Sequence, residues 1–210
     1  MSRTAAAKAS SKRPAQPPQD PTAKYPKPPF PSQSQPWPGL ASKMTPRPDH
    51  GETTYRGSGR LSGRKALITG GDSGMGRAAA IAFAREGADV AINYLPAEEP
   101  DAREVVALIE AVKRVAAPIA GDLRDEGFCR HLVDEAVRRL GGLDILVSNA
   151  GRQQTHASIL DITTEQFDWT PLGRPGQPAE LASIYVQLAA GDASFATGQI
   201  YGAAGGAGQP

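Results

Sequence analysis

The chain has 210 residues, and its 23 basic and 22 acidic side chains leave a net charge of +1. No stretch reaches the ~18 consecutive apolar residues of a membrane span, and the first residues lack the apolar segment of a secretory signal. A single cysteine, Cys129, excludes an internal disulfide framework, and three widely spaced histidines offer no metal-ligand spacing. We therefore expect a cytoplasmic protein without a metal or a membrane partner.

The first 60 residues differ in composition from the rest. They hold 12 of the 19 prolines and 10 basic against 3 acidic side chains, whereas residues 61–210 hold 13 basic and 19 acidic ones. Proline fixes φ and lacks an N–H donor, so this arm cannot form an ordinary helix or a central strand. We expect residues 1–24 to be disordered and residues 25–60, with their scattered aromatic side chains, to lie extended on the folded domain or on a neighbouring subunit.

Other interpretations of the arm stay open at this point. The whole arm can be a free tail, and its acid-free start resembles a mitochondrial transit peptide, although the prolines from Pro14 onward argue against the amphipathic helix that such a peptide needs. Its positive charges are scattered between prolines rather than gathered in a patch. We therefore expect no nucleic-acid partner.

From residue 61 onward, strand and helix patterns alternate. Short apolar runs predict strands over 65–69, 89–94, 115–120 and 144–148, and amphipathic periodicity predicts helices over 77–86, 101–114 and 125–140. Strands separated by helices of this length pair in parallel through right-handed crossovers. The fold class is therefore α/β, a Rossmann-like doubly wound parallel sheet, and residues 61–210 form its domain.

After residue 150 the alternation fails. A helix begins over 163–169 but meets Pro171 after about two turns, and further glycines and prolines follow at once. A helix over 178–190 and a short strand over 199–203 complete the pattern. The alternation of strands and helices is interrupted between Trp169 and Pro171. We therefore expect the fifth and sixth strands of the sheet and their helices to be missing.

Glycines at 70, 74 and 76 stand directly between the first predicted strand and the first predicted helix. In such a loop Gly70 permits a tight turn, Gly74 lets the backbone approach a pyrophosphate, and Gly76 lets the helix pack close to the sheet. The helix start then offers free N–H groups and the positive end of its dipole. A plain glycine-rich turn is the alternative, and the strand-loop-helix context favours the phosphate site.

Several motifs together resemble the short-chain dehydrogenase/reductase family. They are Thr69-Gly70-x-x-x-Gly74-x-Gly76, Gly121-Asp122-Leu123, Asn149-Ala150-Gly151, Gly173-Arg174 and Thr197-Gly198. The arm, with Tyr25-Pro26-Lys27 and Lys43-Met44-Thr45-Pro46, resembles the extended bacterial branch whose members are described as glucose dehydrogenase-like or aldehyde reductase-like. The resemblance implies a nicotinamide dinucleotide as partner and a small alcohol or carbonyl substrate in intact relatives.

The resemblance also implies a role for each matching residue. The pyrophosphate and the adenosine ribose would be held by Gly70, Asp72, Ser73, Gly74, Met75 and Gly76. Asp122 would bond the adenine amino group, with Leu123 beside the ring, and Asn149, Ala150 and Gly151 would flank the cofactor. As alternatives, Asp122 can be a helix cap or turn residue and Asn149 a residue that stabilises the strand end. Ser148 stands where the family often has asparagine.

The choice between NAD and NADP depends on the end of the second predicted strand. An acid there accepts hydrogen bonds from a free ribose 2′-hydroxyl and repels a 2′-phosphate. The chain has Asn93 and Tyr94 at this place, and the first acid after them is Glu98. A neutral asparagine tolerates the phosphate, but no neighbouring arginine clamps it. We therefore expect a slight preference for NADP, with NAD or dual use open.

The family's catalytic residues have no counterpart in the chain. Family members use a serine and a Tyr-x-x-x-Lys pair, in which the tyrosine acts as general acid or base. No tyrosine here has lysine four places later, no lysine follows Lys113, and Tyr185 has the surroundings of a packing residue. We expect an oxidoreductase derived from the short-chain dehydrogenase/reductase family, with little or no turnover. A non-catalytic dinucleotide-binding module and a non-functional deletion product are the alternatives, and the family's homotetramer is doubtful.

Overall fold

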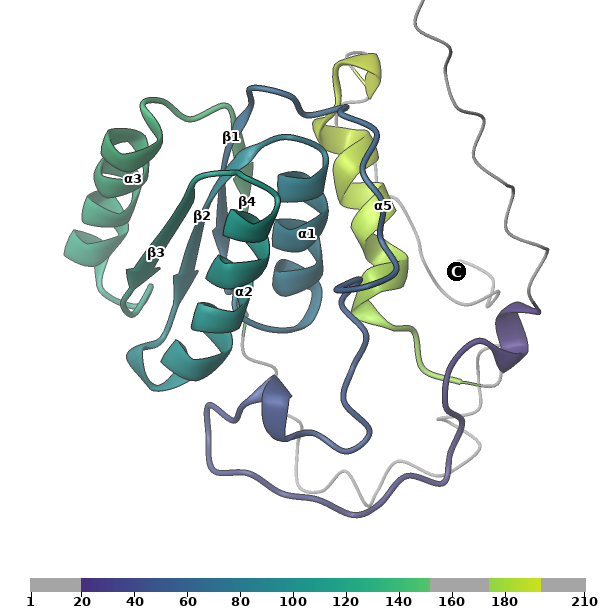
Figure 1. Ribbon diagram of the computed structural model, residues 1–210. Helices are drawn as coiled ribbons and strands as arrows, with labels where there is room; N and C mark the ends of the chain where they lie inside the picture. Colours follow the sequence, from purple (N-terminus) through teal and green to yellow (C-terminus); the bar gives the residue numbers. More distant parts are fainter. Residues whose placement is uncertain (1–19, 152–173, 194–210) are drawn as a thin grey trace, which may run out of the picture.

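The computed structural model describes residues 20–151 and 174–193. One parallel sheet has the strand order β3-β2-β1-β4, formed by β1 (Lys65–Thr69), β2 (Asp89–Tyr94), β3 (Ala116–Ala120) and β4 (Ile145–Val147). The helices are α1 (Gly74–Arg85), α2 (Glu99–Ala111), α3 (Glu126–Leu140) and α5 (Pro178–Ala189) (Figure 1). The predicted α/β, Rossmann-like sheet is therefore confirmed through its fourth strand.

The element boundaries differ from the sequence expectation mainly at helix starts. Helix α1 begins three residues early, at Gly74, because Ser73 already has the extended conformation of an N-cap. Helix α2 begins at Glu99 with Pro100 in its first turn, a position where proline needs no N–H partner. It ends at Ala111, ahead of Lys113 with φ of 61°. The expected helix over 163–169 and the strand over 199–203 lie outside the described residues.

Alternate residues of the strands pack against opposite faces of the sheet, as the two-residue period of a strand requires. On one face, Ala66, Ile68 and Val90 join a buried cluster with residues of α1, α2 and α5. On the other face, Leu67 and Ala91 join a second cluster with the apolar side of α3. The helices therefore form a layer on each side of the sheet.

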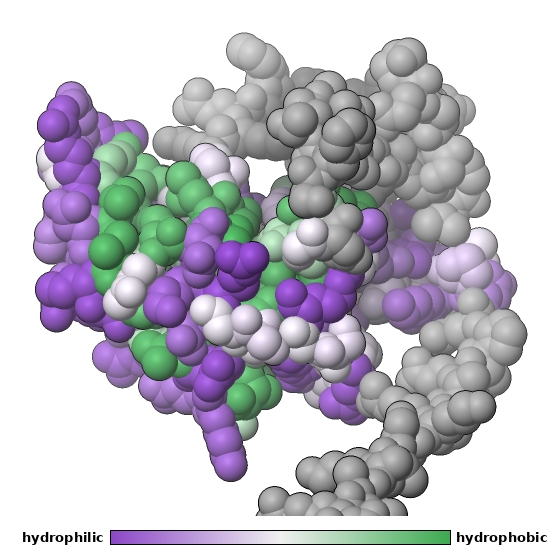
Figure 2. All heavy atoms as spheres, turned by 90° about the horizontal axis from the view of Figure 1, so that it is seen from above, coloured by the Kyte–Doolittle hydropathy of each residue, from purple (hydrophilic) through white to green (hydrophobic). Residues whose placement is uncertain are grey.

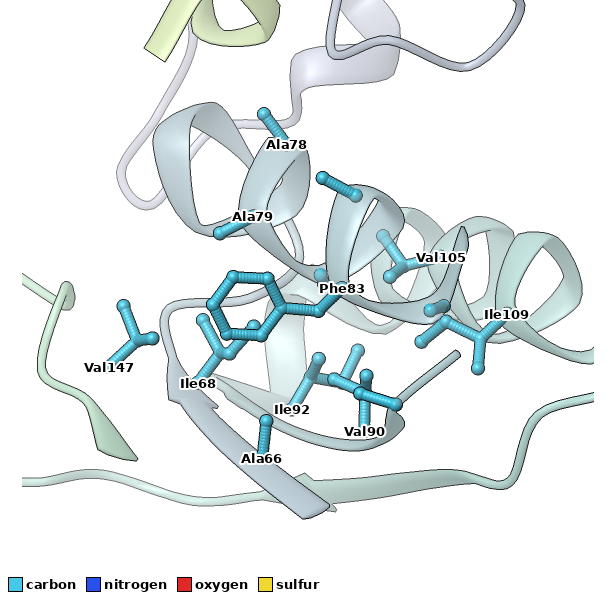
Figure 3. Packing of buried hydrophobic residues seen from close by; sticks show 14 of the residues in the cluster. Ala66, Ile68, Ala78, Ala79, Phe83, Val90, Ile92, Val105, Ile109 and Val147 are labelled. Atoms are coloured by element: carbon cyan, nitrogen blue, oxygen red, sulfur yellow. The ribbon is translucent and has the colours of Figure 1, made fainter. Parts of the chain in front are cut away.

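Phe83 lies at the centre of the first cluster. Its side chain is fully buried and points from α1 to the sheet above Ile68 and Ile92 (Figure 3). The many alanines of α1 let the helix approach both the sheet and α5 closely. Phe83 fills the space that these small side chains leave, so the packing of the α1 layer depends on it.

The face of the sheet that packs against α3 and the edge strand β4 are less completely covered than the face that packs against α1. Among the described residues, β4 pairs only with β1, and Leu146 of β4 is 60% exposed. Val133 and Val137 of α3 are also exposed. The view from above shows hydrophobic residues gathered between hydrophilic ones (Figure 2). Apolar side chains therefore remain exposed at the edge strand β4 and on α3.

The described part of the arm, residues 20–60, lies along the domain. It passes beneath α2 and then runs up beside α5 (Figure 1). The carboxylate of Asp101, fully buried at the start of α2, accepts hydrogen bonds from Ala41 N at 2.6 Å and Ser42 N at 3.3 Å. Glu86, after α1, accepts from Tyr55 Oη at 2.7 Å. Two acids of the domain therefore hold the arm at separate points.

The first described residues of the arm form a single 3-10 turn over Pro21–Ala23. This differs from our expectation of disorder through residue 24. The physical reason is Arg174, which lies 2% exposed before α5 and donates to the carbonyl of Pro21 at 2.9 and 3.0 Å. Its guanidinium also lies 4.8 Å from the ring centre of Tyr25. A contact from far along the sequence thus orders a segment whose own composition favours disorder.

Replacing Phe83 by alanine tests the packing of the first cluster. We expect Phe83→Ala to lower the free energy of unfolding by about 3–5 kcal/mol, since a large side chain leaves a cavity between α1 and the sheet. Urea denaturation followed by circular dichroism measures the change. The control Val133→Ala, at a side chain that is 41% exposed, should change it by less than about 1 kcal/mol. Equal losses in both variants would contradict this packing.

The hydrogen bonds that Glu86 accepts from the arm predict that the stability of the fold depends on pH. Burial alone raises the pKa of Glu86, but hydrogen bonds from Tyr55 and from the backbone N–H groups of Arg60 and Ser58 outweigh burial and hold that pKa below its ordinary value. A carboxylate with a lowered pKa in the folded state stabilises it above the unfolded pKa, and that contribution is lost as the pH falls through the folded pKa.

We therefore expect Glu86→Gln to lose less stability than the wild type when the pH is lowered from neutral to acidic values. Urea denaturation at a series of pH values measures this difference. The matched control is Glu110→Gln, which changes an exposed acid of α2 and should keep the wild-type pH dependence. An unchanged pH dependence in Glu86→Gln would show that this carboxylate does not carry the effect.

Candidate functional site

The predicted site residues come from four segments, the end of β2 among them, that meet at the carboxyl edge of the sheet. Thr69 at the end of β1 pairs with Asn93 of β2, and β4 pairs with β1 on the other side. The glycine loop after β1, the segment after β3 and the segment after β4 therefore lie at the same edge. In open α/β sheets this edge, beside the point where the strand order reverses, is where ligands bind.

The turn from β1 into α1 is closely packed at Gly76. A Cβ atom at Gly76 would lie 2.1 Å from the carbonyl oxygen of Gly70 and 2.6 Å from Nδ2 of Asn149. Real atoms do not approach so closely, so only glycine fits there. The start of α1 thus lies directly against the end of the first strand.

The first turn of α1 is open on its outer side. Gly74 has φ of 53°, in the left-handed region that favours glycine, and a Cβ atom there would have no neighbour within 4 Å. Ser73, the N-cap, makes no side-chain hydrogen bond to the helix, and Met75 is 44% exposed. The amides at the helix start are therefore not covered by the loop's own side chains, which is the arrangement that accepts an anion.

Hydrogen bonds join the glycine loop to the segment after β4. Thr69 Oγ1 accepts from the N–H groups of Asn149 and Ala150, both at 3.0 Å. Asn149 Nδ2 in turn donates to the carbonyls of Thr69 at 3.1 Å and Gly70 at 3.2 Å. The site prediction omitted Thr69, although this residue opens the glycine motif. Ala150 and Gly151 are exposed beside this junction.

Asp72 is a carboxylate inside the glycine loop. It is 2% exposed, and its Oδ2 has no hydrogen-bond partner among the described residues. Burial raises the pKa of this carboxyl group. The Ser73 side chain hydrogen-bonds this carboxyl group. An unpaired acceptor in a buried place costs free energy unless a donor reaches it, so Oδ2 of Asp72 keeps an unused capacity to accept a hydrogen bond.

The two residues expected to contact the adenosine ribose, Asn93 and Tyr94, already have partners within the protein. Asn93 is buried, and its Nδ2 donates to the carbonyls of Ile119 at 3.3 Å and Gly121 at 3.1 Å. Tyr94 is 5% exposed and its hydroxyl donates to Glu99 at 2.6 Å. Burial together with that bond raises the pKa of Tyr94 to about 12. Both side chains tie the end of β2 to its neighbours.

Glu98 returns to the end of β2, where the charge of Asp72 acts on it, although that strand ends four residues before it. The chain turns back after β2 in the 3-10 turn η3 (Pro96–Glu98), and Glu98 accepts from the N–H of Leu95 at 3.0 Å. Burial and the negative charge of Asp72 raise the pKa of Glu98 to about 7. The sequence prediction counted Glu98 as an acid beyond the strand end and did not foresee this neighbour.

The segment after β3 presents one polar and one apolar side chain. Asp122 binds the guanidinium of Arg124 through both carboxylate oxygens, with Nε at 2.9 and 3.1 Å, and this partner lowers the pKa of Asp122. Leu123 is half-buried against the second cluster. Asp122 is exposed enough for a ligand to reach it, with 36% of its side-chain surface accessible.

A cavity of about 540 Å³ lies between the arm and the start of α1. Ser73 and Gly74 line it on the loop side, and Tyr25, Phe30 and Leu40 are among the arm residues that line it. The arm therefore forms one wall of the space beside the open helix start.

The described residues, 20–151 and 174–193, hold neither a metal cluster nor a membrane-spanning helix. No three of the His, Cys, Asp and Glu side chains in that part of the chain gather as a metal site needs. None of the helices described there is long and apolar enough to cross a membrane. Tyr185 of α5 packs half-buried against the first cluster.

Residues 64–170, about half of the chain, match the family model of the short chain dehydrogenases. The uncharacterized oxidoreductase YghA of Escherichia coli is 60% identical over 151 residues, which cover 72% of this chain and 51% of that protein. The uncharacterized oxidoreductase YhxD of Bacillus subtilis is 62% identical over 138 residues, which cover 66% of this chain and 46% of that protein. The chain spans about half the length of the curated relatives it matches.

The fold also matches a solved structure. A short-chain type dehydrogenase/reductase from Mycobacterium marinum superposes with a TM-score of 0.57 at 23% identity, over 66% of this chain and 92% of that one. That likeness supports the doubly wound sheet. The family match covers half of the chain, and the glycine loop lies at the carboxyl edge of that sheet. The chain therefore belongs to the short-chain dehydrogenase family.

Proposed function

We propose that the chain binds a nicotinamide dinucleotide at the glycine loop. The observation that carries this proposal is the uncovered start of α1, where Gly74 leaves open space and Ser73 does not cap the helix with its side chain. Phosphate groups bind at such a helix start because its N–H groups and dipole both favour negative charge. The buried, unpaired carboxylate oxygen of Asp72 supplies an acceptor for a ligand hydroxyl.

The family resemblance assigns the other contacts. The pyrophosphate lies at the backbone of Gly70, Ser73, Gly74, Met75 and Gly76. Asp122 and Leu123 face the adenine, and Asn149, Ala150 and Gly151 flank the nicotinamide half. A bound nicotinamide supplies a hydride donor or acceptor, which in intact relatives reacts with an alcohol or carbonyl carbon.

In this chain we expect binding without turnover. The serine and the Tyr-x-x-x-Lys pair are missing from the sequence, so no side chain can protonate the substrate oxygen in the way that the family requires. The function is that of a dinucleotide-binding module derived from an oxidoreductase. Residues 61–210 act as its incomplete binding domain and residues 1–60 as the arm. Without the missing segment the family's homotetramer is not expected.

Calorimetric titration with NADH and NADPH, joined to a turnover assay, tests this proposal. We expect heat of binding with at least one dinucleotide, and no reduction of alcohol- or aldehyde-type substrates above the rate without protein. Turnover that stays with the protein through purification to homogeneity would contradict the non-catalytic assignment. Silent titrations with both dinucleotides would favour the non-functional deletion product, which resequencing the DNA across codons 168–172 would then examine.

The packing of the glycine loop gives a second test. Gly76→Ala forces a Cβ atom against the Gly70 carbonyl, so α1 must move away from the phosphate position. We expect the affinity for the dinucleotide to fall at least about tenfold. The control is Gly191→Ala, because a Cβ atom at Gly191 meets nothing within 4 Å. Unchanged affinity in Gly76→Ala, with the helical circular dichroism signal preserved, would place the ligand elsewhere.

A further inference from the structure

Two carboxylates stand where the glycine loop meets the end of β2. The N–H of Gly71 donates to the carbonyl of Asn93 at 3.0 Å, which fixes the loop beside that strand end. Asp72 is the next residue and is buried with its Oδ2 unpaired among the described residues. Glu98 reaches the same place through the turn η3, held by its bond from Leu95 N. The acid that the sequence did not provide at the end of β2 is thus supplied from two other segments.

A third acid adds to the negative charge at this place. Asp101 of α2 is fully buried and contributes to the raised pKa of both Asp72 and Glu98. Its oxygens are already engaged by the N–H groups of Ala41 and Ser42. Asp101 therefore affects Asp72 and Glu98 through its negative charge and not through a hydrogen bond to a ligand.

The cations of the surrounding elements are already paired with acids. Arg77 of α1 places Nη2 at 2.8 Å from Glu104 and at 3.2 Å from Glu52, and its Nη1 reaches the backbone carbonyl of Asp72 rather than the carboxylate. On α2, Arg103 pairs with Glu99, and after β3, Arg124 pairs with Asp122. No described arginine or lysine makes an ion pair with Asp72 or Glu98. The end of β2 is therefore an acidic environment.

We infer that Asp72 and Glu98 make this site select a dinucleotide with a free ribose 2′-hydroxyl and reject one with a 2′-phosphate. The chain should therefore bind NAD in preference to NADP, the opposite of the slight preference expected from Asn93. This inference rests on the proposed function, because it concerns the ribose of the same bound dinucleotide.

The physical reason is a difference in hydrogen-bonding and charge. A ribose hydroxyl can donate to the unpaired Oδ2 of Asp72 and so satisfies a buried acceptor. A phosphate in the same place carries negative charge, has no proton to donate when it is fully ionised, and meets two carboxylates instead of an arginine fork. Burial raises the pKa of Asp72, and burial with the charge of Asp72 raises that of Glu98 to about 7. The rejection should therefore be stronger above neutral pH than below it.

Titration of the full chain with NADH and with NADPH tests the inference without any assay of activity. At pH 8, where Glu98 is mostly ionised, we expect NADH to bind at least about tenfold more tightly than NADPH. Glu98→Gln removes a charge but keeps an oxygen that can accept from Leu95 N, so the variant should fold. It should bring the two affinities closer by several-fold, chiefly by strengthening the binding of NADPH.

A second variant and a matched control complete the experiment. Asp72→Asn should weaken NADH binding and narrow the difference between the two dinucleotides, with folding checked by circular dichroism. Glu126→Gln removes a charge from an acid that is 82% exposed on α3 and should leave the affinity ratio unchanged. For the wild type, lowering the pH from 8 to 6 should narrow the ratio as Glu98 takes up a proton.

The outcomes separate this inference from the proposed function. If NADPH binds the wild type as tightly as NADH, or if Glu98→Gln and Asp72→Asn both leave the ratio at its wild-type value, the selection by these carboxylates is overturned while dinucleotide binding stands. If neither dinucleotide binds, the proposed function fails and the inference fails with it.

Discussion

The hydrogen bonds between Thr69 and Asn149 fix the geometry on which the rest of the site depends. One hydroxyl and one amide connect the ends of β1 and β4 and hold the carbonyl of Gly70 in place. Helix α1 can start where it does only because Gly76 packs against that same carbonyl. All the partners belong to the protein, so the position of the open helix start is set before any ligand arrives.

The proline-rich arm shows how a segment without regular structure satisfies its backbone. A chain interrupted by prolines cannot pair its N–H groups along a helix or a sheet. Asp101 and Glu86 provide the acceptors instead, and both belong to the folded domain. The arm's conformation is thus determined by the domain's acids more than by its own sequence, and it forms one wall of the cavity beside α1.

The sequence predicted the elements whose pattern is local. The strands at 65–69 and 89–94 are apolar runs bounded by polar or glycine residues, and the structure places them at those residues. The helix starts were missed because Gly74 and Pro100 disfavour helix interiors but fit the first turn. In the site, the spacing of the glycines was readable. The use of Asn93 within the sheet and the return of Glu98 to Asp72 depend on neighbouring strands and turns, which no local pattern encodes.

The contacts of the arm also have a consequence for the order of assembly. Gln177 accepts from the N–H of Asp49 across 128 residues, and Arg174 donates to Pro21 across 153. A ribosome makes the arm before the sheet, and these two partners emerge only after the four strands have been synthesised. Contacts between residues so distant in sequence close large loops and form slowly. The contacts of Pro21 and Asp49 therefore form after those of Ala41 and Tyr55, whose partners Asp101 and Glu86 are synthesised earlier.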